Sequence, residues 1–141
     1  MKRFLIFALI TFLIGCSQKQ TPVALKDISS YKLLAEHNQY RSSGGRNSLE
    51  INYDLEDYAQ DHADWMVKTK RFKHSNLGVS GWNRVGENIA WGQKDEVAVT
   101  KMWMNSPGHK ANIMNSKYTH VGFGFSSSSD GRVYWCAVFG G

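Results

Sequence analysis

The sequence VGENIAW, residues 85–91, alternates like a β-strand but carries a carboxylate on its apolar face. Side chains of a strand point alternately to its two faces, so Glu87 shares a face with Val85, Ile89 and Trp91. Burying an unpaired carboxylate costs several kcal/mol, a large part of the stability of a small domain. We therefore expect other segments of the chain to close around Glu87.

Two helices are predicted before this strand. A cap at residues 27–30 precedes apolar and aromatic residues at helical spacing, and a Ser-Ser-Gly-Gly stretch at residues 42–45 ends that pattern. The second helix begins near Asp54, because apolar residues recur at i, i+3, i+4, i+7, i+8 and i+11 from Leu55 to Met66. This second pattern predicts an amphipathic helix with one buried face.

Helices and a hairpin are predicted after the strand. A third helix begins at Asp95 and stops before Pro107, since the residue before a proline resists helical dihedrals, and a short helical turn follows over residues 109–114. Apolar residues then alternate with glycines from residue 121, and Asp130-Gly131 forms the turn of a hairpin. The order of elements favours an α+β fold with an antiparallel sheet between helical layers.

The first 15 residues have the composition of a signal peptide. Two basic residues precede an apolar stretch over residues 4–14, which is too short to span a bilayer. The ending LIGC, residues 13–16, resembles the bacterial lipobox, in which Cys16 receives a diacylglycerol on its sulfur. We expect a signal peptide at 1–15, the lipidated Cys16 and a tether at 16–26, and one domain at 27–141. An ordinary secretory signal is the alternative.

The composition bounds what the mature chain can do. Once Cys16 carries lipid, Cys136 is the only thiol left, so no disulfide stabilises the domain, and 42% hydrophobic residues must supply its core. Removing Lys2 and Arg3 leaves 15 basic against 12 acidic residues. This excess of positive charge is modest, so we expect no nucleic-acid partner. The sequence does not determine the oligomeric state.

Three residues could carry chemistry together: His74, Glu87 and His109. They come from a loop, a strand and a helix end. If they converge, the two imidazoles, or a metal ion that they bind, offset the charge of Glu87. Two histidines and one carboxylate suit Zn²⁺ with one coordination position left open. Scattered histidines are more often surface or core residues than ligands, so the set alone leaves both interpretations open.

Several stretches, read together, resemble the bacterial branch of the CAP superfamily of SCP-domain proteins. They occur in the family's order around His74 and are HNQYR (37–41), LEDYAQDHADWM (55–66), GENIAWG (86–92), MWMNSPGHKANIM (102–114), VGFGF (121–125) and YWCAVFG (134–140). Each stretch alone matches the family only loosely, but the ordered set of stretches is specific to it. The resemblance implies a three-layer α-β-α sandwich with a central, mainly antiparallel sheet and a cleft.

The resemblance also implies which residues line that cleft. His74, Glu87 and His109 fall on three of the four cavity positions of the animal and plant members. Ser106 stands at the fourth, where those members have a glutamate, so a possible ligand or general base is missing. The family's paired cysteines are missing as well. Ser-Pro-Gly-His is common in bacterial relatives, so the change need not mean loss of function.

The other histidines and the second cysteine are predicted to be structural. His37, Asn38 and Arg41 belong to the family's first-helix pattern and are expected to tie loops together through side-chain hydrogen bonds. His62 lies on the apolar stripe of the second helix and is interpreted as a hydrogen-bonded core histidine. Cys136 is interpreted as a small buried residue rather than a nucleophile.

The function favoured by the sequence is a non-catalytic binding module held at a bacterial membrane by Cys16, with a lipid or cell-envelope ligand in the cleft. The alternative is a hydrolase in which His74 and His109 bind Zn²⁺ and Glu87 acts as general base. A Ser106 nucleophile deprotonated by His109 is a further alternative. Ser17 is not the aspartate that retains many lipoproteins in the inner membrane, which favours the outer membrane if the host has one.

Overall fold

The computed structural model describes residues 25–141; the predicted signal peptide, Cys16 and most of the predicted tether lie outside the described residues. The described helices are η1 (Leu25–Asp27), α1 (Ser30–Ser43), α2 (Tyr53–Thr69), α3 (Glu96–Met104) and α4 (Pro107–Ile113). The strands are β1 (Glu50–Ile51), β2 (Val85–Trp91), β3 (His120–Ser127) and β4 (Val133–Gly140). None of the helices between residues 25 and 141 has the length and apolar composition needed to cross a bilayer.

The four strands form one mixed sheet in the order β1-β3-β4-β2. The hairpin of β3 and β4 lies in the middle and pairs antiparallel, and β2 adds antiparallel to β4 as an edge strand. The two-residue β1 adds parallel to β3 at the other edge. The predicted α+β class with a mainly antiparallel sheet is confirmed, and the parallel β1 is an element that the sequence analysis did not predict.

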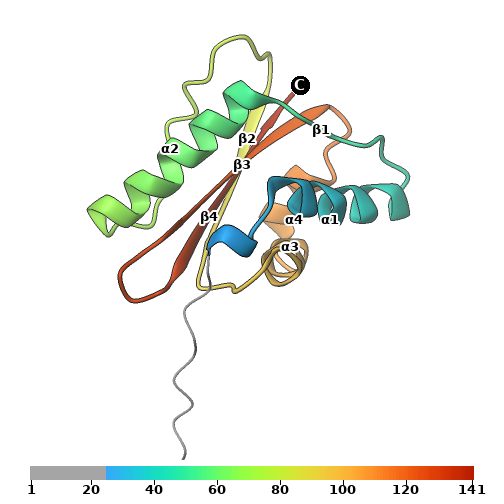
Figure 1. The fold of residues 1–141 in the computed structure, drawn as a ribbon. Helices are drawn as coiled ribbons and strands as arrows, with labels where there is room; N and C mark the ends of the chain where they lie inside the picture. Colours follow the sequence, from blue (N-terminus) through green and yellow to red (C-terminus); the bar gives the residue numbers. More distant parts are fainter. Residues whose placement is uncertain (1–24) are drawn as a thin grey trace, which may run out of the picture.

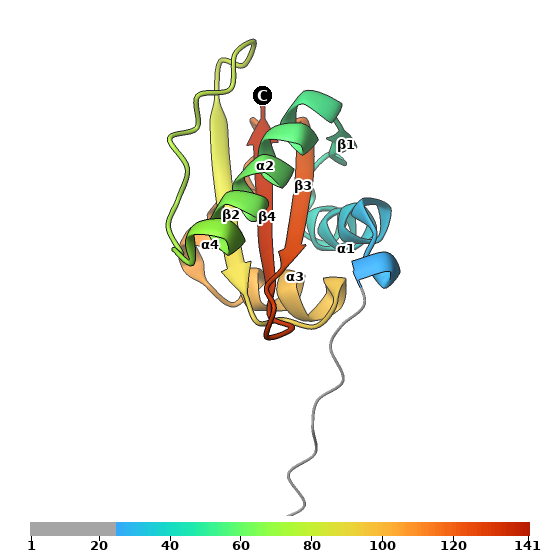
Figure 2. The same ribbon diagram turned by 60° about the vertical axis from the view of Figure 1, so that its left-hand side comes forward.

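Helices cover both faces of the sheet, so the predicted three-layer α-β-α arrangement is confirmed. Helix α2 lies on one face, and α1, α3 and α4 lie on the other (Figure 1). The view in Figure 2 shows α2 crossing β2, β4 and β3, while the segment between α2 and β2 runs along the outer side of β2. This segment, residues 70–84, contains no helix or strand and borders the site described below.

Helix α2 can approach the sheet closely because β3 presents glycines to it. A Cβ on Gly122 would overlap the backbone of Leu55 and Glu56, and a Cβ on Gly124 would overlap that of Ala59. Helix α2 is fixed at its start by Asn52, whose side chain accepts a hydrogen bond from the Leu55 N–H at 3.0 Å. The small residues of β3 therefore set the distance between α2 and the sheet.

The opposite face contains the larger core, and α1 is anchored there through polar side chains. The Arg41 guanidinium donates to four backbone carbonyls, those of Asn47, Ile113, Asn115 and Tyr118, at 2.7–3.1 Å. The Asn38 amide exchanges two hydrogen bonds with the backbone of Leu49, at 2.8 and 3.0 Å. The prediction that Asn38 and Arg41 tie loops together is confirmed.

His37, the third member of that pattern, is fully buried and packs among aromatic rings. Its centroid lies 4.9 Å from that of Phe123 and 5.7 Å from that of Trp103. Its Nδ1 lies 2.8 Å from the Leu33 carbonyl, which can only accept, so Nδ1–H is the donor. Burial lowers the pKa of His37 to about 4, so the ring is neutral at neutral pH.

Candidate functional site

Glu87 lies in the middle of β2 with its side chain only 1% exposed, on the face that α2 covers. Its Oε1 accepts hydrogen bonds from the Ser75 N–H at 3.0 Å and from His74 Nδ1 at 2.7 Å. The side chain of His74 is nevertheless 61% exposed. The partners that the sequence predicted for Glu87 thus come first from the segment that follows α2.

A second histidine approaches the same carboxylate from α2. His62 Nε2 lies 3.9 Å from Glu87 Oε2 and 2.9 Å from the Lys73 carbonyl. A carbonyl can only accept, so Nε2–H donates to Lys73, and His62 is a hydrogen-bonded buried histidine as predicted. Two imidazoles thus lie near Glu87, those of His74 and His62, and the sequence analysis had not named His62 as a neighbour of this carboxylate.

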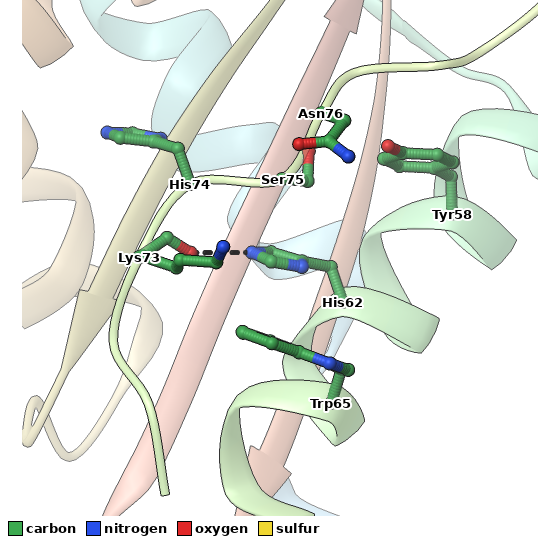
Figure 3. A pocket seen from close by; sticks show the side chains of 7 residues that line it. All are labelled: Tyr58, His62, Trp65, Lys73, His74, Ser75 and Asn76. Carbon is green, nitrogen blue, oxygen red and sulfur yellow. Dashed lines mark hydrogen bonds between the residues drawn. The ribbon is translucent and has the colours of Figure 1, made fainter. Parts of the chain in front are cut away.

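These contacts build one wall of a pocket of about 290 Å³ between α2 and residues 73–76. Figure 3 shows Tyr58, His62 and Trp65 projecting from α2 toward that segment. His62 stacks on Trp65, with centroids 5.5 Å apart and planes at 11°, and the Lys73 Nζ lies 5.6 Å from the same indole. The pocket thus combines aromatic surface with exposed cationic and polar groups.

His109 and Ser106 are held on the other side of β2, because α4 packs on the opposite face of the sheet. The buried Asn88 donates to the His109 carbonyl at 3.0 Å, and Asn112 donates to Asn88 Oδ1 at 2.9 Å. No hydrogen bond or ion pair joins Glu87 to His109 or Ser106, all of which the structure describes. Ser106 is the N-cap residue of α4, and its side chain makes no cap hydrogen bond.

The ring of His109 nevertheless lies close enough to His74 to be affected by its charge. Burial first, and the charge of His74 second, lower the pKa of His109 below the ordinary value. Its Nδ1 is buried without a hydrogen-bond partner among the described residues. With Phe72 and Trp91 it lines a second, largely apolar pocket of about 220 Å³ at the end of β2.

Cys136 completes the surroundings of Glu87 from the neighbouring strand β4. It is fully buried, and its Sγ lies 3.7 Å from Glu87 Oε2, so the thiol is the donor. Burial first, and the Glu87 charge second, raise the pKa of Cys136 well above its ordinary value. A protonated, inaccessible thiol is no nucleophile, which agrees with the predicted structural role.

The donor atoms of the site do not form a zinc centre in this arrangement. Zinc in proteins takes three or four ligands from histidine, cysteine and carboxylate side chains. In the part of the chain from residue 25 onward, no three such side chains are grouped so that they could hold a metal ion. His74 Nδ1 and Glu87 Oε1 are bonded to each other. The zinc site of His74 and His109 stays a prediction of the sequence.

Comparison of the sequence with profiles of known protein families agrees with the fold. A profile of the cysteine-rich secretory protein family, CAP, matches residues 34–139, which include every residue of the site. The chain belongs to the CAP family. The chain is 34% identical to YkwD of Bacillus subtilis over an alignment of 122 positions, which covers 77% of this chain and 47% of YkwD. The chain therefore spans about half the length of this relative.

Solved structures show the same CAP fold. An extracellular protein of Bacillus anthracis that contains an SCP domain superposes with a TM-score of 0.70 at 25% identity, covering 78% of this chain and 39% of that one. An outer surface protein of Borrelia burgdorferi superposes with a TM-score of 0.69 at 24% identity, covering 77% of this chain and 88% of that one. These two bacterial proteins are named as extracellular and surface proteins.

Proposed function

We propose that this CAP-domain protein is a non-catalytic binding module of the bacterial cell envelope, anchored through lipid on Cys16, and that its cleft holds a lipid or another envelope component. The leader and the LIGC ending support the anchor, and the extracellular and surface relatives support an extracytoplasmic location. An outer-membrane address, where the host has one, rests on Ser17 following the cysteine.

The binding role is inferred from the hydrogen bonds that Glu87 accepts. Both hydrogen bonds to its Oε1 come from the segment after α2, and His62 connects the same segment to α2. The carboxylate thereby holds residues 73–75 against the sheet, where they form the wall of a pocket. Glu87 thus shapes a concave surface. In this proposal His74 is the hydrogen-bond partner of Glu87 and neither binds a metal ion nor acts as a catalytic base.

The anchor is tested on the full chain expressed in a bacterium. Mass spectrometry of the detergent-extracted protein should show a chain that begins at Cys16 and carries a diacylglycerol. A Cys16→Ala variant should lack the diacylglycerol and keep its leader. A wild-type protein with an unmodified Cys16 would contradict the anchor without affecting the binding role.

Binding is tested on the same detergent-extracted protein with panels of envelope lipids and glycans, by native mass spectrometry and titration. We expect one retained ligand class, and His74→Ala should weaken it because the wall of the pocket loosens. Arg46→Ala is the control, since Arg46 is exposed in the loop after α1. Absence of binding across both panels would overturn the proposal.

A further inference from the structure

One end of the sheet combines exposed aromatic rings with a cation. Phe72, in the segment after α2, is 47% exposed, and Trp91, the last residue of β2, is 45% exposed. Their ring centroids lie 6.4 Å apart, and the Arg132 guanidinium carbon lies 4.3 Å from the centroid of the Trp91 ring. Single exposed apolar side chains are common on proteins, but two that contact each other indicate a binding surface.

Further cations flank these two rings. Lys68, Lys70 and Arg71 come directly before Phe72, are exposed, and form no ion pair with another described residue. Because Phe72 contacts Trp91 and Trp91 contacts Arg132, three separate segments meet on one surface. We call this surface the basic-aromatic patch, and it consists of Lys68, Lys70, Arg71, Phe72, Trp91 and Arg132.

The excess positive charge of the chain is concentrated in the segments that build the patch. Residues 64–73, 91–95 and 130–132 together contain six cations and three carboxylates. Their excess of three equals the whole excess of 15 basic over 12 acidic residues that remains without Lys2 and Arg3. The rest of the chain is balanced, with nine residues of each sign. Charge complementarity therefore favours an anionic partner at the patch.

The described chain begins at the same end of the sheet. Figures 1 and 2 both show η1, the last turn of α2, the end of β2 and the turn between β3 and β4 in the lower half of the molecule. The Ser29 N–H donates to Glu96 Oε1 at 2.8 Å, which joins the start of α1 to the start of α3, five residues after Trp91. The predicted tether therefore enters the domain near the patch.

The predicted tether keeps this end close to the membrane if Cys16 carries lipid. Nine residue steps separate Cys16 from Leu25, and an extended chain spans at most about 3.3–3.6 Å per residue, so the tether reaches roughly 30 Å at most. A folded domain of this size has a radius of gyration of about 13 Å and is roughly 35 Å across. A bilayer that holds the Cys16 lipid thus lies within reach of the patch.

The two kinds of side chain in the patch are matched together by an anionic bilayer. Tryptophan is enriched at the headgroup level of membranes, because its ring is apolar and its N–H is polar. A lysine or arginine near an anionic membrane strengthens binding by roughly fivefold. A soluble polyanion would match the cations and leave Phe72 and Trp91 exposed, and a neutral bilayer would match only the rings.

We propose that the basic-aromatic patch binds the anionic phospholipids of the bilayer that holds the Cys16 lipid. The inference rests on the proposed lipid anchor and adds a second, reversible contact between the domain and the membrane. The pocket beside α2 belongs to another part of the surface, so a ligand there and the bilayer at the patch do not compete for the same residues.

The test uses the full lipidated chain in vesicles of brominated phosphatidylcholine, with or without phosphatidylglycerol, and measures quenching of tryptophan fluorescence by the bromine. We expect stronger quenching in the vesicles with phosphatidylglycerol, and high salt should remove the difference. Trp91→Phe should remove most of the difference. Trp82→Phe is the matched control and should keep it, because Trp82 packs against Gly140, which pairs with Val85 at the other end of β2.

A second pair of variants tests the cations. Combined replacement of Lys68, Lys70 and Arg71 by Gln should lower the ratio of docked to undocked domains at least about tenfold. A control variant loses the same net charge at exposed positions outside the patch and should change the ratio by less than about twofold. Its substitutions are Arg46→Gln, Arg84→Gln and Lys117→Gln.

The outcomes separate the patch from the anchor. Equal quenching in the two kinds of vesicle overturns the patch and leaves the anchor standing, and this holds also if soluble polyphosphate binds the chain. A difference that persists unchanged in both Trp91→Phe and the patch charge variant overturns the patch as well. A chain without lipid on Cys16 contradicts the anchor. Cosedimentation of that chain with the same vesicles then decides the patch: preference for the anionic vesicles supports it, and equal sedimentation overturns it.

Discussion

His74 donates its Nδ1–H to Glu87 Oε1 across 2.7 Å, and this bond joins a segment without regular secondary structure to the middle of an edge strand. The Ser75 N–H reaches the same oxygen at 3.0 Å. Two successive residues therefore bind one buried atom. The end of the segment is held separately, since Arg84 exchanges two backbone hydrogen bonds with Gly141, so the carboxylate fixes the part around His74 and Ser75.

Removing this carboxylate should loosen the segment. In Glu87→Ala, the His74 and Ser75 donors lose their acceptor and a cavity opens beside Cys136, so we expect a loss of about 1–3 kcal/mol in the free energy of unfolding. Glu87→Gln keeps an acceptor oxygen and the shape, and should lose less. Urea unfolding measures both, and hydrogen exchange at the Ser75 amide should accelerate most in Glu87→Ala. A Glu87→Ala protein as stable as wild type would contradict the structural role of this carboxylate.

The glycines of β3 give a prediction about packing between layers. Gly124→Ala would drive a methyl group into the backbone of Ala59 and Gln60, which cannot move without displacing α2. We expect the free energy of unfolding, measured with urea, to fall by about 1–3 kcal/mol, the usual cost of overpacking. Gly78→Ala is the control, because nothing lies within 4 Å of its added methyl, and its stability should stay within about 0.5 kcal/mol of wild type.

Much of the fold was predictable because local patterns agree with it. The alternation over residues 85–91 predicted β2 and the face of Glu87, and the stripe from Leu55 to Met66 predicted α2. Strand β1 was missed, since two residues paired with β3 carry no periodicity. The glycines at 122 and 124 were interpreted as part of a hairpin, whereas their contact with α2 depends on tertiary packing.

The site was predictable only in part, because its members meet through packing rather than through sequence spacing. His74 and Glu87 are joined as the sequence analysis expected. His62 was predicted to be a hydrogen-bonded core histidine, but its place beside Glu87 was not predicted, because that depends on which face of the sheet α2 covers. His109 is held by Asn88 on the opposite face, and the order of layers that decides this is not visible in a motif.

Arg41 offers a test of how α1 is anchored. Its side chain is 1% exposed, and its guanidinium serves four carbonyls from two separate segments. Arg41→Lys keeps the charge but replaces the planar fork by a single ammonium group, which cannot reach all four. We expect a loss of at least about 3 kcal/mol in the free energy of unfolding. Arg46→Lys, at an exposed position of the following loop, should change it by less than about 0.5 kcal/mol.

The buried His37 predicts a loss of stability in mild acid. Its pKa is about 4 in the folded protein and 6.5 in the unfolded chain, so below pH 6.5 the unfolded state binds the proton first. Stability contributed by the neutral ring is complete above pH 6.5 and is lost as the pH falls toward 4, by about 3 kcal/mol in total. His109, whose pKa is also lowered, adds to the loss in the same direction.

Comparing His37→Phe with wild type isolates the contribution of His37, because His109 is present in both proteins. Phenylalanine does not titrate and suits the aromatic surroundings, and the Leu33 carbonyl retains its helical position. We expect urea unfolding free energies that fall clearly less between pH 7 and pH 5 in His37→Phe than in wild type. Equal slopes in wild type and His37→Phe would show that the pKa of His37 is the same in the folded and unfolded states, since such a group cannot make stability depend on pH.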